Sequence, residues 1–363
     1  MTTSLAAMAD HPILFLPGPT EVDAELRAVM ARPLVGHREA EFVTVVQDVC
    51  ARLRDLFVTD QPAAFETCPA TALMEAGIRN LVPRLGRSLH LTAGAFGERW
   101  QAIAASCGRT TKALPVPLGH AHSPAALRQA LQADPDFAAV CITHNETSTG
   151  VIEPLRELAA VVHEAAPQAL VLVDVVTSLA GAELRCAEWG IDFAFAGTQK
   201  CLALPPGLCV YTASARALMR AATIDERGFL LDLPVALAET NAGKTIATPC
   251  VPLVWALQRQ LQRIATEGLP QRIARHRALR EATMQWATAR GFAPFVADAD
   301  ARSPSVSCID ARGGDVAALA KRATAAGFKI DQGYGSLRGK AFRIGHMGDH
   351  DLASLRALLQ ALG

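Results

Sequence analysis

Apolar and polar positions alternate between two kinds of pattern along this chain. Uninterrupted apolar runs, typical of strands that are buried on both faces, occur at 138–143 (AAVCIT), 170–175 (LVLVDV), 193–196 (FAFA) and 208–211 (LCVY). Between such runs, apolar residues recur three and four positions apart, at 42–57 and 154–165 for example, which predicts helices with one buried face. This alternation predicts an α/β protein with a mostly parallel sheet between helices.

The pattern changes after about residue 250. A long helical pattern at 251–290 is broken at 268–270, and shorter elements follow. We predict strands at 305–310, 329–331 and 342–344, and helices at 317–326 and 352–362. These elements form a small C-terminal α+β domain in our interpretation, because 363 residues exceed the usual size of one core. The predicted division is an N-terminal segment at 1–20, a large domain at 21–255 and the small domain at 256–363.

Composition narrows the classes of function. Lys plus Arg equals Asp plus Glu, 35 each, so charge gives no reason to expect nucleic acid or an anionic membrane as a partner. The nine cysteines lack CxxC spacing, which argues against a metal site and a disulfide framework. The first residues lack the pattern of a signal peptide, and no long apolar run predicts a membrane span. We therefore expect a cytoplasmic protein without a metal.

Two charged residues stand out beside the apolar runs. Lys200 follows the run at 193–196, and partial desolvation at the end of a buried strand lowers the pKa of an amine, as an imine with an aldehyde requires. Asp174 lies within the run at 170–175, where an unpaired carboxylate is costly to bury. A cofactor with a pyridine ring and an aldehyde needs both groups. Taken alone, Lys200 could also be an ordinary surface lysine, and Asp174 could be a cap in a turn or at the start of a helix.

The segments that carry these two residues, DVVTSLAG at 174–181 and AGTQKCLALPPGL at 196–208, resemble the class V aminotransferases of fold type I. The alanine–glyoxylate and serine–pyruvate aminotransferase group is the most similar, and the resemblance runs from LPGPTEV at 16–22 to FRIGHMG at 342–348. The resemblance implies that the cofactor is pyridoxal 5'-phosphate, that the large domain has a mostly parallel sheet of the seven-stranded type, and that the protein is a homodimer. It also implies amino transfer from a small amino acid (alanine or serine type) to a small 2-oxo acid (glyoxylate or pyruvate type).

The resemblance also implies roles for individual residues. Lys200 and Asp174 are the expected catalytic residues. The cofactor is expected to contact Ala70, Thr71, Phe96, Thr147, Asp174, Val176, Gln199, Lys200 and Thr248. Phe96 and Val176 correspond to residues that pack on opposite faces of the ring, although Trp100 is a competing aromatic one helical turn later. Thr147 corresponds to a hydroxyl that bonds the ring oxygen, and Thr248 to a residue that reaches the partner subunit's cofactor phosphate.

One segment departs from the family. FETCPATALMEAG at 65–77 predicts a strand followed by a helix, whose free N–H groups form an anion site. The family usually has a glycine-rich turn here, but this chain has Cys68, Pro69, Ala70 and Thr71. Pro69 lacks an N–H donor and Ala70 has less backbone freedom than glycine. The sequence therefore predicts a weakened phosphate site.

Because KAFRIGHMG matches a FRIG-like motif of the family, the resemblance implies that Arg343 binds the substrate α-carboxylate, to which its planar guanidinium can donate two parallel hydrogen bonds. In the predicted strand, Phe342 and Ile344 would point into the small domain and Arg343 toward the cleft. The local pattern alone fits a surface arginine. Two other functions stay open: a lyase or cysteine desulfurase of the same fold, whose members commonly have histidine where Gln199 stands, and a degenerate, non-catalytic protein.

Overall fold

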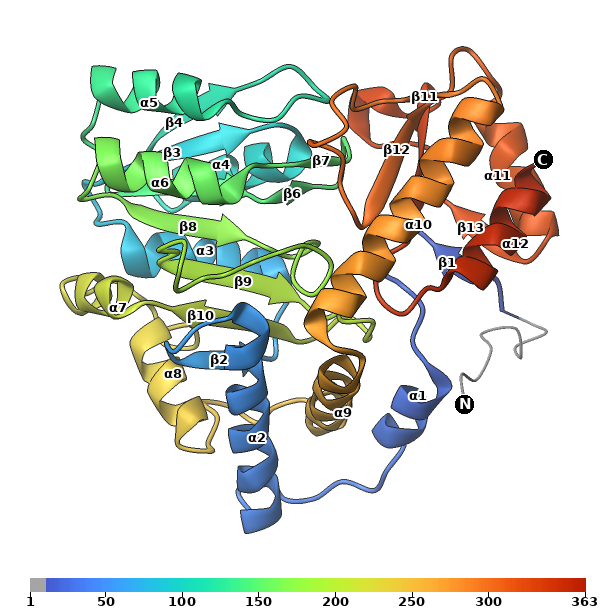
Figure 1. Ribbon diagram of the computed structural model, residues 1–363. Coiled ribbons are helices and arrows are strands. Elements are labelled where there is room, and N and C mark those ends of the chain that lie inside the picture. Colours follow the sequence, from blue (N-terminus) through green and yellow to red (C-terminus); the bar gives the residue numbers. More distant parts are fainter. Residues whose placement is uncertain (1–10) are drawn as a thin grey trace.

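The computed structural model describes residues 11–363 and has an α/β architecture (Figure 1). The predicted N-terminal tail at 1–10 lies outside the described residues. A seven-stranded sheet forms the centre, and from one edge to the other its strands are β2 (Ala63–Glu66), β10 (Cys209–Ala213), β9 (Phe193–Gly197), β8 (Leu170–Asp174), β5 (Ala139–Thr143), β3 (Arg87–Thr92) and β4 (Thr110–Pro115). Strand β10 runs in the direction opposite to that of the other six strands. The predicted fold class is confirmed.

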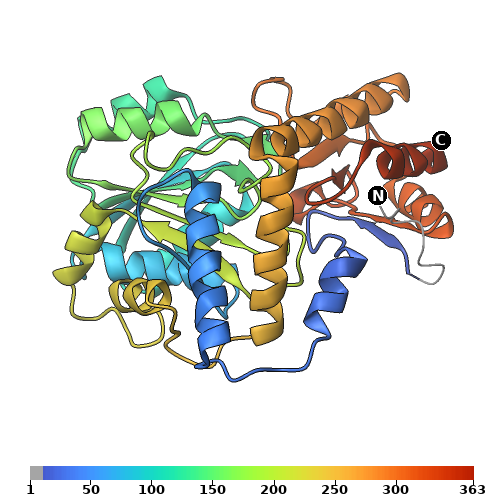
Figure 2. The ribbon, with the colours of Figure 1, turned by 60° about the horizontal axis from the view of Figure 1, so that its bottom comes forward.

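Both faces of this sheet are buried, because alternate residues of a strand point to opposite sides. In β8, Val171 and Val173 belong to one hydrophobic cluster, whereas Leu170 and Leu172 belong to the other. The first face is covered by α2 (Ala40–Phe57), α5 (Pro124–Ala133), α6 (Leu155–Ala165) and α9 (Val251–Glu267), and the second by α3 (Ala70–Leu81), α4 (Ala95–Ser106), α7 (Ala215–Ala222) and α8 (Leu233–Asn241). Figure 2 shows α2 and α9 side by side on the first face.

The C-terminal part has its own small sheet and hydrophobic cluster. Its elements are α10 (Leu269–Ala289), β11 (Ala293–Pro294), β12 (Val306–Asp310), α11 (Val316–Ala325), β13 (Phe328–Ile330), the 3₁₀ turn η2 (Gly335–Leu337), β14 (Ala341–Gly345) and α12 (Leu352–Leu362). The start of the chain returns here, because β1 (Ile13–Phe15) pairs in parallel with β13. The segment after β1 therefore runs from this part toward the central sheet, and α1 (Ala24–Met30) follows it (Figure 1).

The break that the sequence predicts at 268–270 is present, because Gly268, with φ +85°, separates α9 from α10. Other elements differ from those that the sequence predicts. Helix α8 lies in a stretch without a clear pattern, because its apolar residues are spread around the helix. The polar segment after β5 forms a short hairpin of β6 (Asn145–Glu146) and β7 (Val151–Ile152). None of the helices within residues 11–363 has the length and hydrophobicity needed to cross a membrane.

Candidate active site

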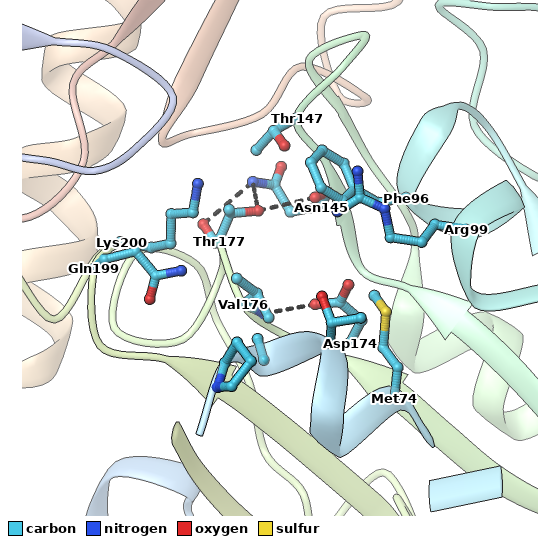
Figure 3. A pocket seen from close by; sticks show the side chains of 13 residues that line it. Met74, Phe96, Arg99, Asn145, Thr147, Asp174, Val176, Thr177, Gln199 and Lys200 are labelled. Carbon is cyan, nitrogen blue, oxygen red and sulfur yellow. Dashed lines mark hydrogen bonds between the residues drawn. The ribbon is translucent and has the colours of Figure 1, made fainter. Parts of the chain in front are cut away.

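The carboxyl ends of three neighbouring strands, β5, β8 and β9, open onto a cavity of about 210 Å³ (Figure 3). This edge is where open α/β sheets bind ligands, and the first turns of α3 and α4 contribute the other walls. The cavity is lined by Pro69, Ala70, Thr71, Met74, Phe96, Arg99, Asn145, Thr147, Asp174, Val176, Thr177, Gln199 and Lys200. Eight of the ten residues singled out from the sequence thus line one cavity, and Thr248 and Arg343 do not.

Lys200 reaches the cavity from the turn after β9. Burial lowers the pKa of its amine to about 8, and the nearby Arg343 guanidinium acts in the same direction. Its Nζ donates a hydrogen bond to the carbonyl oxygen of Pro17 at 2.5 Å. Gly18 follows with φ +108°, and a Cβ there would lie 2.3 Å from Nζ. The segment after β1 therefore holds the lysine amine, and a side chain at position 18 would displace it.

Asp174 is the last residue of β8 and is only 4% exposed. Burial raises the pKa of its carboxyl to about 7, and the negative charge of Glu146 also raises it. One carboxylate oxygen accepts the Val176 N–H at 2.8 Å. The described residues provide no salt-bridge partner for this carboxylate. A carboxyl in such surroundings favours a cationic ligand group at the base of the cavity, because that group would stabilise its ionised form.

Phe96 and Val176 line the cavity from different elements, α4 and the loop after β8. The buried Glu146 fixes the start of α4, because its Oε2 accepts the N–H groups of Phe96 at 2.9 Å and Gly97 at 3.2 Å. Its other oxygen accepts the Ser148 hydroxyl at 2.5 Å. This carboxylate cap, which the sequence interpretation did not identify, positions Phe96. The competing aromatic, Trp100, is buried in the core beneath.

The first turn of α3 forms another wall. Pro69 is its N-cap residue, and within the described part of the chain no side chain caps this helix. The N–H groups of Ala70 and Thr71 belong to this first turn, which is a ready site for an anion. The loss of glycine therefore leaves the backbone donors of the helix in place, and only Pro69 lacks an N–H.

Arg343 is buried behind Thr147 at the boundary with the C-terminal part. Its Nη1 donates to the Thr147 carbonyl oxygen at 2.7 Å, and its Nε to Asp331 Oδ1 at 2.7 Å. Phe342 and Ile344 point into the C-terminal hydrophobic cluster, so Arg343 lies on the opposite side of β14, as the strand alternation predicts. The structure thus places its guanidinium next to a cavity-lining residue and close enough to Lys200 to affect its pKa.

Thr248 is exposed and does not line the cavity of its own chain. Its expected contact with the partner subunit's cofactor stays a prediction. The sequence interpretation also missed some lining residues. Asn145 and Thr177 clamp the loops after β5 and β8, since Asn145 Nδ2 donates to Thr177 Oγ1 at 2.8 Å. Both lie in polar segments directly after buried strands, which is a usable signal. Met74 and Arg99 lie on helices, where periodicity carries no such signal.

A lysine and an aspartate at the ends of adjacent strands of such a sheet define the class of fold type I pyridoxal-phosphate enzymes. The family model described as "Aminotransferase class-V" matches residues 91–342. The chain therefore belongs to the class V aminotransferase family, and it is an enzyme.

Individual relatives agree with this assignment. An uncharacterized aminotransferase from Methanocaldococcus jannaschii is 34% identical over 93% of this chain and 88% of its own. A serine–glyoxylate aminotransferase from Methylorubrum extorquens is 31% identical over 96% of this chain and 89% of its own. The crystal structure of an alanine–glyoxylate aminotransferase from Nostoc sp. matches with a TM-score of 0.92 at 29% identity, over 98% of this chain and 96% of that one.

This family depends on pyridoxal 5'-phosphate, and the groups around the cavity fit this cofactor. The Asp174 carboxyl, whose pKa burial raises, suits a protonated ring nitrogen. The Lys200 amine, whose pKa burial lowers, suits an aldehyde. The uncapped first turn of α3 suits a phosphate. The cavity therefore offers one matching group for each reactive or charged part of the cofactor.

Proposed function

We propose that this enzyme moves an amino group from a small amino acid of the alanine or serine type to a small 2-oxo acid, glyoxylate or pyruvate. The observation that carries this proposal is that Lys200 and Asp174 line one cavity at the ends of adjacent buried strands. Glyoxylate is named as a substrate of two of the relatives above. The choice of donor rests on the resemblance to the alanine–glyoxylate and serine–pyruvate aminotransferase group.

In this proposal Lys200 has two tasks. Bound pyridoxal phosphate supplies an aldehyde and an electron-withdrawing ring. Lys200 would hold the cofactor through this aldehyde, and its free Nζ would move the substrate α-proton as general base and acid. An amine with a pKa of about 8 suits this task, because both of its protonation states are populated near neutral pH.

The other residues hold the reactants. Asp174 would hold the protonated ring nitrogen, Phe96 and Val176 would pack against the ring, and Thr147 would bond its oxygen. The first turn of α3, with Ala70 and Thr71, would receive the phosphate, and Gln199 would contact the cofactor beside Lys200. Arg343 receives the substrate α-carboxylate on the part of its guanidinium that Asp331 and Thr147 do not occupy. These groups exclude water from the reacting carbon and fix its orientation.

A desulfurase is the second candidate function, and the environment of Cys201, the cysteine next to Lys200, argues against it. Such a reaction needs a thiolate near the substrate. Cys201 follows Lys200, but it is buried, and burial raises the pKa of its thiol to about 11. All nine cysteines are free thiols, which supports a reducing, cytoplasmic location.

We also propose a homodimer, in which Thr248 of one subunit completes the phosphate site of the other.

Reduction with borohydride followed by peptide mapping tests the central assignment. The cofactor should become fixed to Lys200, and Lys200→Ala should bind the cofactor without covalent attachment and lose turnover. Attachment to cofactor-free protein should accelerate roughly 50-fold between pH 6 and pH 8, because the neutral fraction of an amine with a pKa of about 8 rises by that factor. Labelling of another lysine would remove Lys200 from this role.

A panel of amino donors against glyoxylate and pyruvate tests the substrates. Bleaching of the visible absorption by alanine or serine, and its recovery with glyoxylate, supports the proposed pair. Release of sulfide from cysteine would favour the desulfurase instead.

A further inference from the structure

Tyr334 lies at the boundary between the C-terminal part and the cavity. It belongs to the loop between β13 and β14 and directly precedes η2. Its ring lies 6.0 Å from the ring of Phe96, with 28° between the planes, and 37% of the residue is exposed. An aromatic residue on a surface loop therefore stacks on a residue that lines the cavity. The proposed function gives Tyr334 no role.

Two arginines hold this ring in place. Arg99 Nη2 donates to the Tyr334 hydroxyl at 3.2 Å, and the Arg99 guanidinium itself lies 4.9 Å from the centre of the Phe96 ring. On the other side, the Arg343 guanidinium lies 5.4 Å from the centre of the Tyr334 ring. Since Phe96 and Arg99 line the cavity and Arg343 bonds to Thr147, which also lines it, the ring bridges two walls of the site.

The loop also ties the position of this ring to that of Arg343. Asp331 Oδ1 accepts both the Arg343 Nε–H at 2.7 Å and the Gly333 N–H at 2.8 Å. Gly333 has φ +92°, and a Cβ there would lie 2.5 Å from the Leu337 carbonyl oxygen. The turn before Tyr334 therefore requires glycine at position 333, and a single carboxylate, that of Asp331, links this turn to the proposed anchor for the substrate carboxylate.

We propose that Tyr334 is a specificity-determining residue, whose ring disfavours amino donors with more than one carbon atom in the side chain. The proposal rests on the proposed function, in which Arg343 binds the α-carboxylate. A substrate held there would present its α-carbon to Lys200. The Tyr334 ring contacts both the Arg343 guanidinium and the Phe96 ring, so a side chain longer than that of alanine or serine would meet this ring.

The test compares Tyr334→Ala with Tyr334→Phe, which keeps the ring and loses only the hydroxyl. For each holoenzyme, kcat/KM is measured with alanine, 2-aminobutyrate and norvaline at a fixed glyoxylate concentration. In the wild type, kcat/KM should fall roughly tenfold for each added methylene group, the lower end of what a pocket discriminates. Tyr334→Ala should flatten this series, and Tyr334→Phe should retain it. Thermal unfolding checks that both variants are folded, and Tyr334→Leu replaces Tyr334→Ala if that variant is not.

A binding measurement separates this inference from the proposed function. Acetate, propionate, butyrate and valerate are titrated into the same holoenzymes, and binding is followed through the visible absorption of the cofactor. The wild type should discriminate against the longer acids and Tyr334→Ala should not, even if no amino donor reacts. An equally steep series in the wild type and Tyr334→Ala overturns the proposal. Loss of the series in Tyr334→Phe also overturns it, because selectivity would then depend on the hydroxyl and not on the ring.

Discussion

The two ends of the cavity are built in different ways. At the end that carries the proposed chemistry, Lys200 and Asp174 project from adjacent buried strands, and burial shifts both pKa values toward neutrality. At the end proposed for the phosphate, the available donors are backbone N–H groups in the first turn of α3, where Pro69 and Thr71 are exposed. The first end depends on particular side chains, whereas the second depends mainly on where a helix begins.

This difference explains why the sequence can depart from its family at one end and not at the other. No other side chain can replace a buried amine or a buried carboxylate in the proposed roles. An N–H group, by contrast, is supplied by every residue except proline, so the turn tolerates Ala70 and Thr71 as long as the helix starts there. We therefore expect substitutions at the strand ends to affect turnover, and substitutions around the phosphate to affect mainly the retention of cofactor.

The largest effect is expected for Asp174→Ala. Removal of one member of a buried charge pair typically costs about 3–5 kcal/mol, which corresponds to a loss in kcat of roughly a hundredfold to several thousandfold. The cofactor-free protein should not lose stability. The pKa of Asp174 is raised from 3.8 to about 7 in the folded state, so this carboxyl destabilises the fold increasingly as the pH rises from about 4 to 7, and the full cost is present at pH 8. Thermal unfolding of cofactor-free protein at pH 8 and steady-state kinetics measure the two effects.

Asp174→Asn is the matched control, because its carbonyl oxygen can still accept the Val176 N–H. It should lose nearly as much activity as the alanine variant, since the amide cannot carry the negative charge. A kcat close to that of the wild type in either variant would exclude Asp174 as the partner of the ring nitrogen.

The next largest effect is expected for Arg343→Ala, which tests whether Arg343 binds the substrate α-carboxylate. Loss of a charge-assisted contact to a buried carboxylate typically costs about 2–5 kcal/mol, so kcat/KM for amino acids should fall roughly 30-fold to several thousandfold. Reaction with a simple amine that lacks a carboxylate should hardly change. Equal losses for both substrates would mean that Arg343 serves structure alone.

Arg343 also bonds to Asp331 and Thr147, and therefore a control for misplacement is needed. Asp331→Asn leaves the guanidinium present and removes the charge that orients it. This variant should raise KM for amino acids less than Arg343→Ala does. As with Arg343→Ala, reaction with a simple amine that lacks a carboxylate should hardly change.

The sequence was sufficient for the fold and for much of the cavity, for a physical reason. Strands buried on both faces give apolar runs, and a charged residue at the end of such a run, as with Lys200 or Asp174, is conspicuous. The Glu146 cap of α4 and the Tyr334 contact with Phe96 could not be predicted, because they join segments that are 50 or more residues apart. Distant contacts of this kind depend on how loops cross the sheet edge, which periodicity does not describe.

The smallest effect is expected at the phosphate end, for Thr248→Ala. Thr248 is exposed in the isolated chain and does not line its own cavity, as expected of a residue that serves the partner subunit's site. A hydrogen bond to a charged group contributes about 1.5–3 kcal/mol, so the cofactor Kd should rise roughly 10-fold to 150-fold. Thr248→Ser keeps the hydroxyl and should retain the cofactor in dialysis as the wild type does. Because the site would be shared, retention should also fall on dilution below the dimer dissociation constant, which sedimentation measures. A fully active monomer, or an unchanged Kd in Thr248→Ala, would show that α3 holds the phosphate without help from a second subunit.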